Sequence, residues 1–171
     1  MRPKLQLGNT RYLLLDQDYM QTLELRIPPL ALVLTSACLM ALIAYFVPFD
    51  LPIPEPTLIA SALGLAGAIV AIAGVVAFKK HKTTVNPFTP ERSSSLVASG
   101  IYKYTRNPMY LGFFLLLAGW AVLLSNLVAL ALLPAFIAYM NRFQIQPEER
   151  ALKQHFGTDF QAYMQRVRRW I

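Results

Sequence analysis

Three long stretches of this chain contain no Asp, Glu, Lys or Arg: 27–49, 57–78 and 108–141. An apolar helix of about 20 residues crosses the roughly 30 Å hydrocarbon core of a bilayer. The first two stretches therefore each predict one membrane-spanning helix, and the third is long enough for two. Ser125-Asn126, in the middle of the third stretch, favours a tight turn. The pattern predicts spanning helices at roughly 28–47, 57–78, 108–125 and 127–143.

The polar segments divide the chain into three predicted regions. Residues 1–27 are expected to form an interfacial segment, and 28–78 to hold the first two crossings. Residues 79–171 combine a long polar loop, a helical hairpin and a tail. Apolar residues recur at helical intervals in the tail, and this pattern predicts amphipathic C-terminal helices. Gly157 is expected to end the first of them. The sequence therefore predicts an all-α polytopic membrane protein with about four spanning helices.

The composition supports this fold class, since hydrophobic residues make up 56% of the chain and charged residues only 15%. The net charge of +7 follows the topology. Basic residues gather before the first crossing, in the loop after residue 78 and in the tail, whereas Asp50 and Glu55 are the only charged residues of the 48–56 connection. The positive-inside rule then places both termini in the cytoplasm. If the cell is prokaryotic, the membrane is the plasma (inner) membrane. This distribution argues against a nucleic-acid partner.

A polar segment between two apolar blocks, Gly100–Gly112, is the strongest candidate for chemistry. Because 108–143 is expected to form a hairpin, both ends of that hairpin reach the same membrane surface. The topology therefore places Arg106 and Tyr110 near the acidic pair Glu148-Glu149, which follows the hairpin. A polar cluster with apolar walls at a membrane edge is a default binding-site hypothesis.

A purely structural interpretation of the same residues stays open. Asn107-Pro108 is a typical start of a helix, and Arg106 and Tyr110 are suited to anchor a helix at the interface. Two carboxylates in the first turn of a helix complement its dipole. The two histidines flank different predicted helices and no Cys/His cluster is present, so no metal site is expected.

The two polar segments together resemble a known family. The first reads Leu96-Val-x-x-Gly100-x-Tyr102-x-x-x-Arg106-Asn107-Pro108-x-Tyr110-x-Gly112, and the second reads Glu148-Glu149-x-x-Leu152-x-x-x-Phe156-Gly157. This pattern resembles the isoprenylcysteine carboxyl methyltransferase and phospholipid methyltransferase superfamily, whose members are integral membrane enzymes that use S-adenosylmethionine. The resemblance covers about residues 79–170.

The resemblance implies a role for each matching residue. The cofactor, released as S-adenosylhomocysteine after transfer, would be bound by Leu96, Val97, Gly100, Tyr102, Arg106, Asn107, Pro108, Tyr110, Glu148 and Glu149. Arg106 would pair with its carboxylate, the two glutamates would bind its amino or ribose groups, and the two tyrosines would stack on adenine or flank the methyl group. Arg142, the nearest basic residue before the acidic pair, would hold the methyl acceptor or, alternatively, anchor the end of its helix at the membrane interface. Arg106, Arg142 and Glu149 are therefore the candidate catalytic residues.

Two positions depart from the isoprenylcysteine enzymes, because Asn107 and Ser94 stand where those enzymes tend to have His. The implied reaction is in-line methyl transfer to a lipophilic acceptor drawn from the bilayer, such as the carboxylate of an isoprenylcysteine. An amine or a thiol acceptor stays open. Two other functions remain as alternatives: a membrane reductase of the sterol-reductase type with a nicotinamide cofactor, and a non-catalytic membrane scaffold or carrier.

Overall fold

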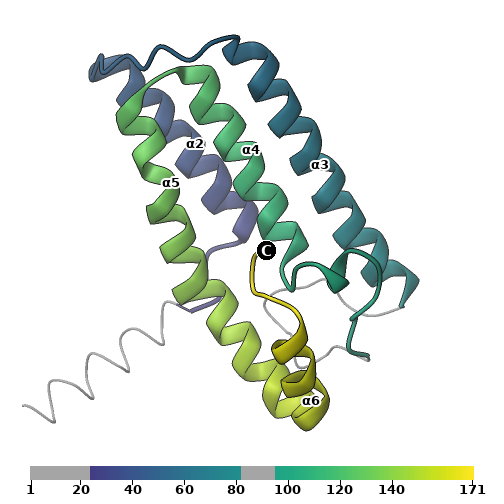
Figure 1. Ribbon diagram of the computed structural model, residues 1–171. Helices are drawn as coiled ribbons and strands as arrows, with labels where there is room; N and C mark the ends of the chain where they lie inside the picture. The colour runs from purple at the N-terminus through teal and green to yellow at the C-terminus, as the bar shows by residue number, and fades with distance from the viewer. Residues whose placement is uncertain (1–23, 82–94) are drawn as a thin grey trace, which may run out of the picture.

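The computed structural model of the protein describes residues 24–81 and 95–171. Most of the predicted interfacial segment and the middle of the polar loop, including Ser94, lie outside the described residues. The described part is helical (Figure 1). Its elements are α2 (Pro29–Phe46), α3 (Pro56–Lys80), the 3₁₀ turn η2 (Gly100–Lys103), α4 (Pro108–Leu124), α5 (Leu127–Tyr139), the π-helix η3 (Met140–Ile145) and α6 (Gln146–Arg166).

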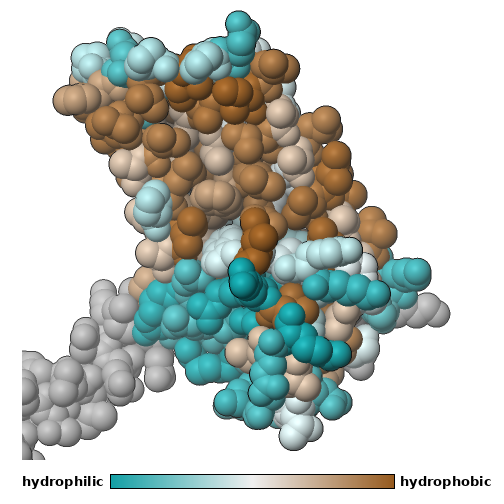
Figure 2. Space-filling view, in the orientation of Figure 1, coloured by the Kyte–Doolittle hydropathy of each residue, from teal (hydrophilic) through white to brown (hydrophobic). Residues whose placement is uncertain are grey.

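The four predicted crossings correspond to α2, α3, α4 and α5, which confirms the all-α membrane fold. α2 and α3 are long and apolar enough to cross a bilayer, and so is the continuous stretch Leu127–Arg166, whereas α4 is a shorter apolar helix. That continuous stretch combines α5 and η3 with the polar α6. Figure 2 shows an apolar body and a hydrophilic end that contains α6. The apolar body is the part that fits the bilayer core, and α6 lies outside it.

α4 is the central helix of the bundle. It packs along α3 on one side and against α2 and α5 on the other (Figure 1). The contact with α3 is backbone-close: a Cβ added at Gly112 would lie 2.6 Å from the Gly67 carbonyl oxygen and 2.7 Å from the Ala71 Cβ. Small residues permit such an approach between helices in lipid. Gly67 and Gly112 therefore permit the close packing of α3 on α4.

The turn of the hairpin lies at Ser125-Asn126, as predicted. Ser125 adopts the left-handed conformation with φ 48°, and Asn126 caps α5 by accepting a hydrogen bond from the Ala129 amide at 3.0 Å. The Asn126 side chain also donates to the Val47 carbonyl at 2.8 Å. One buried side chain therefore closes the hairpin and ties it to the end of α2.

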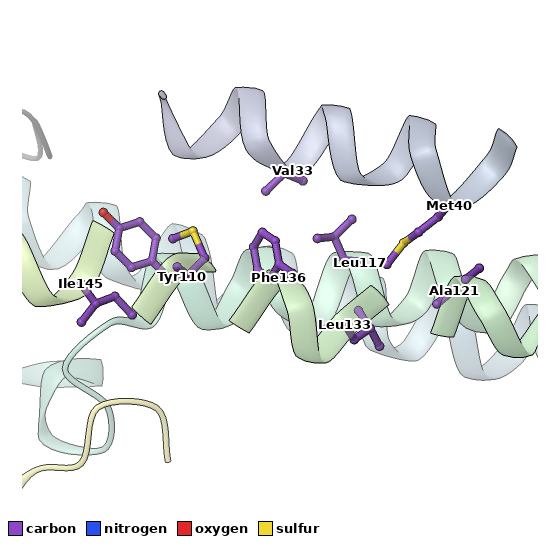
Figure 3. Packing of buried hydrophobic residues seen from close by; sticks show 10 residues of the cluster. Val33, Met40, Tyr110, Leu117, Ala121, Leu133, Phe136 and Ile145 are labelled. Atoms are coloured by element: carbon purple, nitrogen blue, oxygen red, sulfur yellow. The ribbon is translucent and has the colours of Figure 1, made fainter. Parts of the chain in front are cut away.

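The apolar core runs through the middle of α2, α4 and α5 (Figure 3). Met40, Leu117 and Met140 are at most 1% exposed. Tyr110 and Ile145 lie next to each other at one end of this row (Figure 3). The core therefore ends where the polar residues of α4 and α6 begin.

A second, smaller core lies under the polar end. It joins Val97 and Tyr102 of the loop to Phe160, Tyr163 and Val167 of the tail. The amphipathic tail helix is confirmed, and its apolar face packs on the loop. Gly157 interrupts α6 with φ 52° and ψ −121°, as the sequence predicts, and this break lets the second half of the tail turn back toward the bundle.

Candidate active site

The site is built where the loop enters α4. Gly100 has φ 61°, a conformation that costs glycine little, and it begins the turn η2. The carbonyl of Tyr102 at the end of this turn accepts a hydrogen bond of 2.7 Å from the hydroxyl of Tyr163. Pro108 then starts α4. The loop is therefore fixed to the tail immediately before the polar residues appear.

Arg106 is the centre of the polar cluster. Its Nη1 donates to the carbonyls of Met164 at 3.1 Å and Val167 at 2.6 Å, and its Nη2 donates to Glu149 Oε1 at 2.6 Å. The side chain is only 10% exposed. Its Nε is buried and finds no hydrogen-bond partner among the described residues. Such a buried donor calls for an explanation, because buried polar groups are nearly always paired.

Glu149 binds two guanidinium groups. Its Oε1 accepts from Arg106, and Arg169 donates to both oxygens, from Nε at 3.1 Å and from Nη2 at 2.6 Å. Burial raises the pKa of Glu149, but the hydrogen bonds and charges of Arg169 and Arg106 outweigh it and hold the pKa below its ordinary range. Glu149 is therefore a carboxylate in the neutral pH range.

Glu148 has a different environment. Its Oε1 accepts a hydrogen bond from the hydroxyl of Tyr110, and no salt bridge of Glu148 occurs among the described residues. Burial raises its pKa to about 8; the charge of Glu149 acts in the same direction and the Tyr110 hydrogen bond opposes it. Burial and the neighbouring Tyr163 raise the pKa of Tyr102, and the charge of Glu148 adds a smaller effect in the same direction. The Tyr102 phenol therefore lies close to Glu148. Adjacent glutamates thus differ in protonation.

Asn107 and Pro108 start α4, as the sequence predicts. Asn107 precedes the helix, but its side chain makes no capping bond. It donates from Nδ2 to the carbonyl of Arg169 at 2.9 Å, and the Thr105 hydroxyl donates to the same carbonyl at 3.4 Å. The Asn107 side-chain amide bonds the Arg169 carbonyl because the tail passes the start of α4, where the Arg106 amide also donates to the Arg168 carbonyl.

A π-helix joins the hairpin to α6. Pro147 has no amide hydrogen and cannot bond the Phe143 carbonyl one turn earlier. That carbonyl accepts from the Leu25 amide at 3.0 Å instead. π-Helical turns often mark functional sites. Here the turn sets the direction in which Glu148 and Glu149 leave the hairpin.

Arg142 lies in this π-helix and has its own partner. Its Nη1 contacts Glu24 Oε1 at 2.5 Å, and its guanidinium carbon lies 5.3 Å from the centre of the Phe143 ring. The second oxygen of Glu24 binds Arg150. The structure thus places Arg142 in a second charged group (Glu24, Arg142 and Arg150), distinct from the Arg106–Glu149 pair.

The predicted cofactor residues come from three elements that meet at the polar end. Arg106, Tyr110, Glu148 and Glu149 are joined by direct contacts, as the topology predicted. Leu96 and Val97 belong to the smaller core beside Tyr102. Among the described residues no group of three His, Cys, Asp or Glu side chains is placed to hold a metal ion. The roles of these residues remain predictions.

Sequence reasoning missed Arg169 and Thr105. Arg169 belongs to a basic run before the last tryptophan, a pattern that is typical of a membrane-interface anchor. Helical periodicity cannot relate Arg169 to the acidic pair, because the helix is interrupted at Gly157 and the chain is extended after Arg166. Thr105, which is 2% exposed, stands within the recognised segment but has no special spacing.

Several relatives cover parts of the chain. An uncharacterized protein of Haemophilus influenzae is 41% identical over 63 residues, which are 37% of this chain and 100% of that protein. A protein-S-isoprenylcysteine O-methyltransferase of Schizosaccharomyces pombe is 36% identical over 42% of this chain and 30% of the relative. Protein-S-isoprenylcysteine O-methyltransferase B of Arabidopsis thaliana is 31% identical over 60% of this chain and 52% of the relative.

The chain thus spans about half, or less, of the length of the named methyltransferases that it matches. No solved structure gives a significant match. The family model described as phospholipid methyltransferase matches residues 56–159, which is more than half of the chain. The match runs from α3 into α6 and includes both Arg106 and Glu149. The chain therefore belongs to the phospholipid methyltransferase family of membrane methyltransferases.

Proposed function

We propose that the polar cluster binds S-adenosylmethionine and that the protein transfers its methyl group to a lipophilic acceptor. The observation that carries this proposal is the pairing of the two predicted half-sites. Arg106 contacts Glu149 at 2.6 Å and Tyr110 contacts Glu148. The two segments that carry the resemblance to the methyltransferases therefore meet at one site.

The residues present fit this cofactor chemically. Carboxylates suit a ligand that carries positive charge on sulfur and on its amino group, and Glu148 has no cation of its own among the described residues. The buried Nε of Arg106, which has no hydrogen-bond partner among the described residues, would donate to a carboxylate in a charge-assisted bond. Tyr102 and Tyr110 supply aromatic faces beside these groups. Leu96, Val97, Gly100 and Pro108 form the adjoining apolar wall, and Asn107 holds the tail.

Catalysis by these residues consists of positioning and exclusion of water. When bound, S-adenosylmethionine supplies an electrophilic methyl group and leaves as S-adenosylhomocysteine. Arg106 and Glu149 hold each other at a fixed distance, so the polar cluster is preorganised before any ligand arrives. The apolar core below Tyr110 keeps water from the acceptor side. A carboxylate acceptor needs no general base.

An amine or a thiol that arrives protonated must lose its proton. Glu148 is the residue placed to take it, because its pKa of about 8 lies near the working pH of most cells. Glu149 is a poor base, since two arginines stabilise its charged form. From the sequence alone, the loss of this proton could depend on Glu149, on Tyr110 or on the acceptor's own ionisation. This proposal assigns the role of proton acceptor to the Tyr110–Glu148 pair.

The acceptor enters from the bilayer and the cofactor from the cytoplasmic side, where the polar end lies in this proposal. If the cell is prokaryotic, the membrane is the plasma (inner) membrane. Residues 79–171 form the catalytic region and 28–78 its membrane support. The relatives named for isoprenylcysteine favour a carboxylate on a lipid-like chain. Arg142 would orient that carboxylate, because its guanidinium lies at the hairpin end, six residues before Glu148.

The product of the reaction tests this function. Purified protein in lipid nanodiscs is incubated with methyl-labelled cofactor and either prenylated cysteine peptides or a membrane lipid extract, and the labelled product is identified by mass spectrometry. A base-labile methyl ester on the prenylated peptide is expected. The absence of any methylated product in both mixtures, or oxidation of a nicotinamide cofactor instead, would contradict it. The family match does not favour the reductase or the non-catalytic scaffold.

A further inference from the structure

We propose that Arg169, near the end of the chain, is a positioning residue of the cofactor site and acts through Glu149. The inference rests on the proposed function and adds a fourth segment to the site, the tail after α6. Arg169 is not among the residues quoted for the resemblance, and it lies beyond residue 159, where the family match ends. Figure 1 shows the C-terminus back beside the first turn of α4.

Arg169 is held at both ends. Its guanidinium binds both oxygens of Glu149 at 3.1 and 2.6 Å, and its carbonyl accepts from the Asn107 side chain at 2.9 Å. Glu149 in turn accepts from Arg106, the residue before Asn107. These contacts form a closed ring through the start of α4, the start of α6 and the tail. Two-pronged pairing fixes the plane of a carboxylate as well as its distance.

The tail is docked on both sides of this ring. The Arg106 amide donates to the Arg168 carbonyl at 3.0 Å. The Trp170 indole donates to Asn141 Oδ1 at 3.0 Å, and its ring lies 6.4 Å from the ring of Phe114. Removal of the Arg169 guanidinium leaves all these contacts in place. The variant therefore separates the orientation of Glu149 from the docking of the tail.

Arg169 changes the net charge of the site. With Arg106 alone, Glu149 would neutralise that guanidinium. With Arg169 added, the three side chains carry one net positive charge. The buried Nε of Arg106, which has no partner in the described part of the chain, can then donate to an anionic group. Because Glu149 is shared between Arg106 and Arg169, it does not fully neutralise Arg106. The site therefore keeps a positive charge that can attract the carboxylate of the cofactor.

The test measures binding of S-adenosylhomocysteine by isothermal titration calorimetry for Arg169→Gln, Arg169→Lys, Glu149→Gln and the double variant Arg169→Gln/Glu149→Gln. Arg168→Gln is the matched control, because Arg168 is the exposed neighbour whose backbone makes the same kind of contact. We expect Arg169→Gln to weaken binding about tenfold or more, which corresponds to about 1.4 kcal/mol. Arg168→Gln should stay within about twofold of the wild type.

Coupling distinguishes positioning from a general structural effect. If Arg169 acts through Glu149, the double variant binds no more weakly than Glu149→Gln alone, and Arg169→Lys recovers part of the loss. Methyl-transfer kinetics of Arg169→Gln should then show a raised KM for S-adenosylmethionine and a kcat near that of the wild type.

Wild-type affinity in Arg169→Gln, or fully additive losses in the double variant, would overturn the inference while leaving the proposed function intact. A wild type that does not bind S-adenosylhomocysteine would overturn the proposed function itself. If Arg169→Gln does not give folded protein, Arg169→Lys takes its place, since lysine keeps the charge but cannot pair with both oxygens in one plane; affinity equal to the wild type then contradicts the inference.

Discussion

Arg106 and Glu149 are 43 residues apart in the chain and joined by a hydrogen bond of 2.6 Å. The bond crosses from the residue just before α4 to the first turn of α6, and so closes the polar end of the helical hairpin. Glu149 is consequently a fixed carboxylate. Its neighbour Glu148, bonded to Tyr110, keeps a proton at higher pH. The two halves of the acidic pair therefore have different chemical capacities.

The first prediction concerns this difference and the pH dependence of stability. Because the pKa of Glu148 rises from 4.5 to about 8 on folding, the folded protein holds a proton between these pH values that the unfolded chain has released. The contribution of Glu148 to the free energy of unfolding is therefore full below about pH 4.5 and decreases as pH rises toward 8. Glu149, with a lowered pKa, acts in the opposite direction and only below its ordinary range.

Glu148→Gln keeps an oxygen for the Tyr110 hydroxyl and carries no charge. We expect the apparent melting temperature of the wild type, relative to this variant, to decrease between pH 5 and about 8. Asp159→Asn, an exposed acid on the same helix, is the control and should show no such trend. Thermal unfolding in detergent, followed by circular dichroism, measures both. Parallel curves for wild type and Glu148→Gln would show that Glu148 titrates normally.

The second prediction concerns the support of the site. In Gly112→Ala the new Cβ would lie 2.6 Å from the Gly67 carbonyl oxygen and 2.9 Å from the Ala71 amide nitrogen, so two helix backbones must separate. We expect a loss of about 1–3 kcal/mol, which is typical of overpacking. Gly64→Ala is the matched control, because its Cβ would meet nothing within 4 Å. Unchanged melting temperature in Gly112→Ala would contradict the close α3–α4 contact.

The third prediction separates Arg142 from Arg150, which share Glu24. If Arg142 orients the acceptor, Arg142→Gln lowers kcat about tenfold or more and leaves the affinity for S-adenosylhomocysteine within about twofold. Arg150→Gln, whose side chain is 53% exposed, should leave both near the wild type. Steady-state kinetics with a prenylated peptide, together with calorimetry, measure the two effects. Equal losses in the two variants would mean that Arg142 serves only its ion pair.

The sequence predicts the membrane fold well, because bilayer thickness imposes a length on apolar stretches. The charge-free segments locate α2 to α5 closely, and Ser125-Asn126 marks the hairpin turn. The same topology brings Arg106 near Glu149, since the ends of a hairpin must meet. These features depend on composition and length, which a single sequence displays directly.

The tail contacts could not be predicted in this way. The Asn107 side chain bonds the Arg169 carbonyl and does not cap α4, a choice decided by where the chain returns after Gly157. The π-helix at Met140–Ile145 depends on two residues outside it. Pro147 cannot donate to the Phe143 carbonyl, and the Leu25 amide donates to that carbonyl instead. Each feature joins segments distant in the chain, for which local pattern carries no signal.

Binding of S-adenosylhomocysteine to the purified protein tests the central claim most directly. Calorimetry in nanodiscs should show saturable binding at one site per chain for the wild type. Glu149→Gln should lose most of the affinity, because Arg106 and Arg169 are left without their shared carboxylate. Asp159→Asn should bind like the wild type. No binding by the wild type, or binding of a reduced nicotinamide cofactor in its place, would contradict the assignment of this cluster as a methyl-donor site.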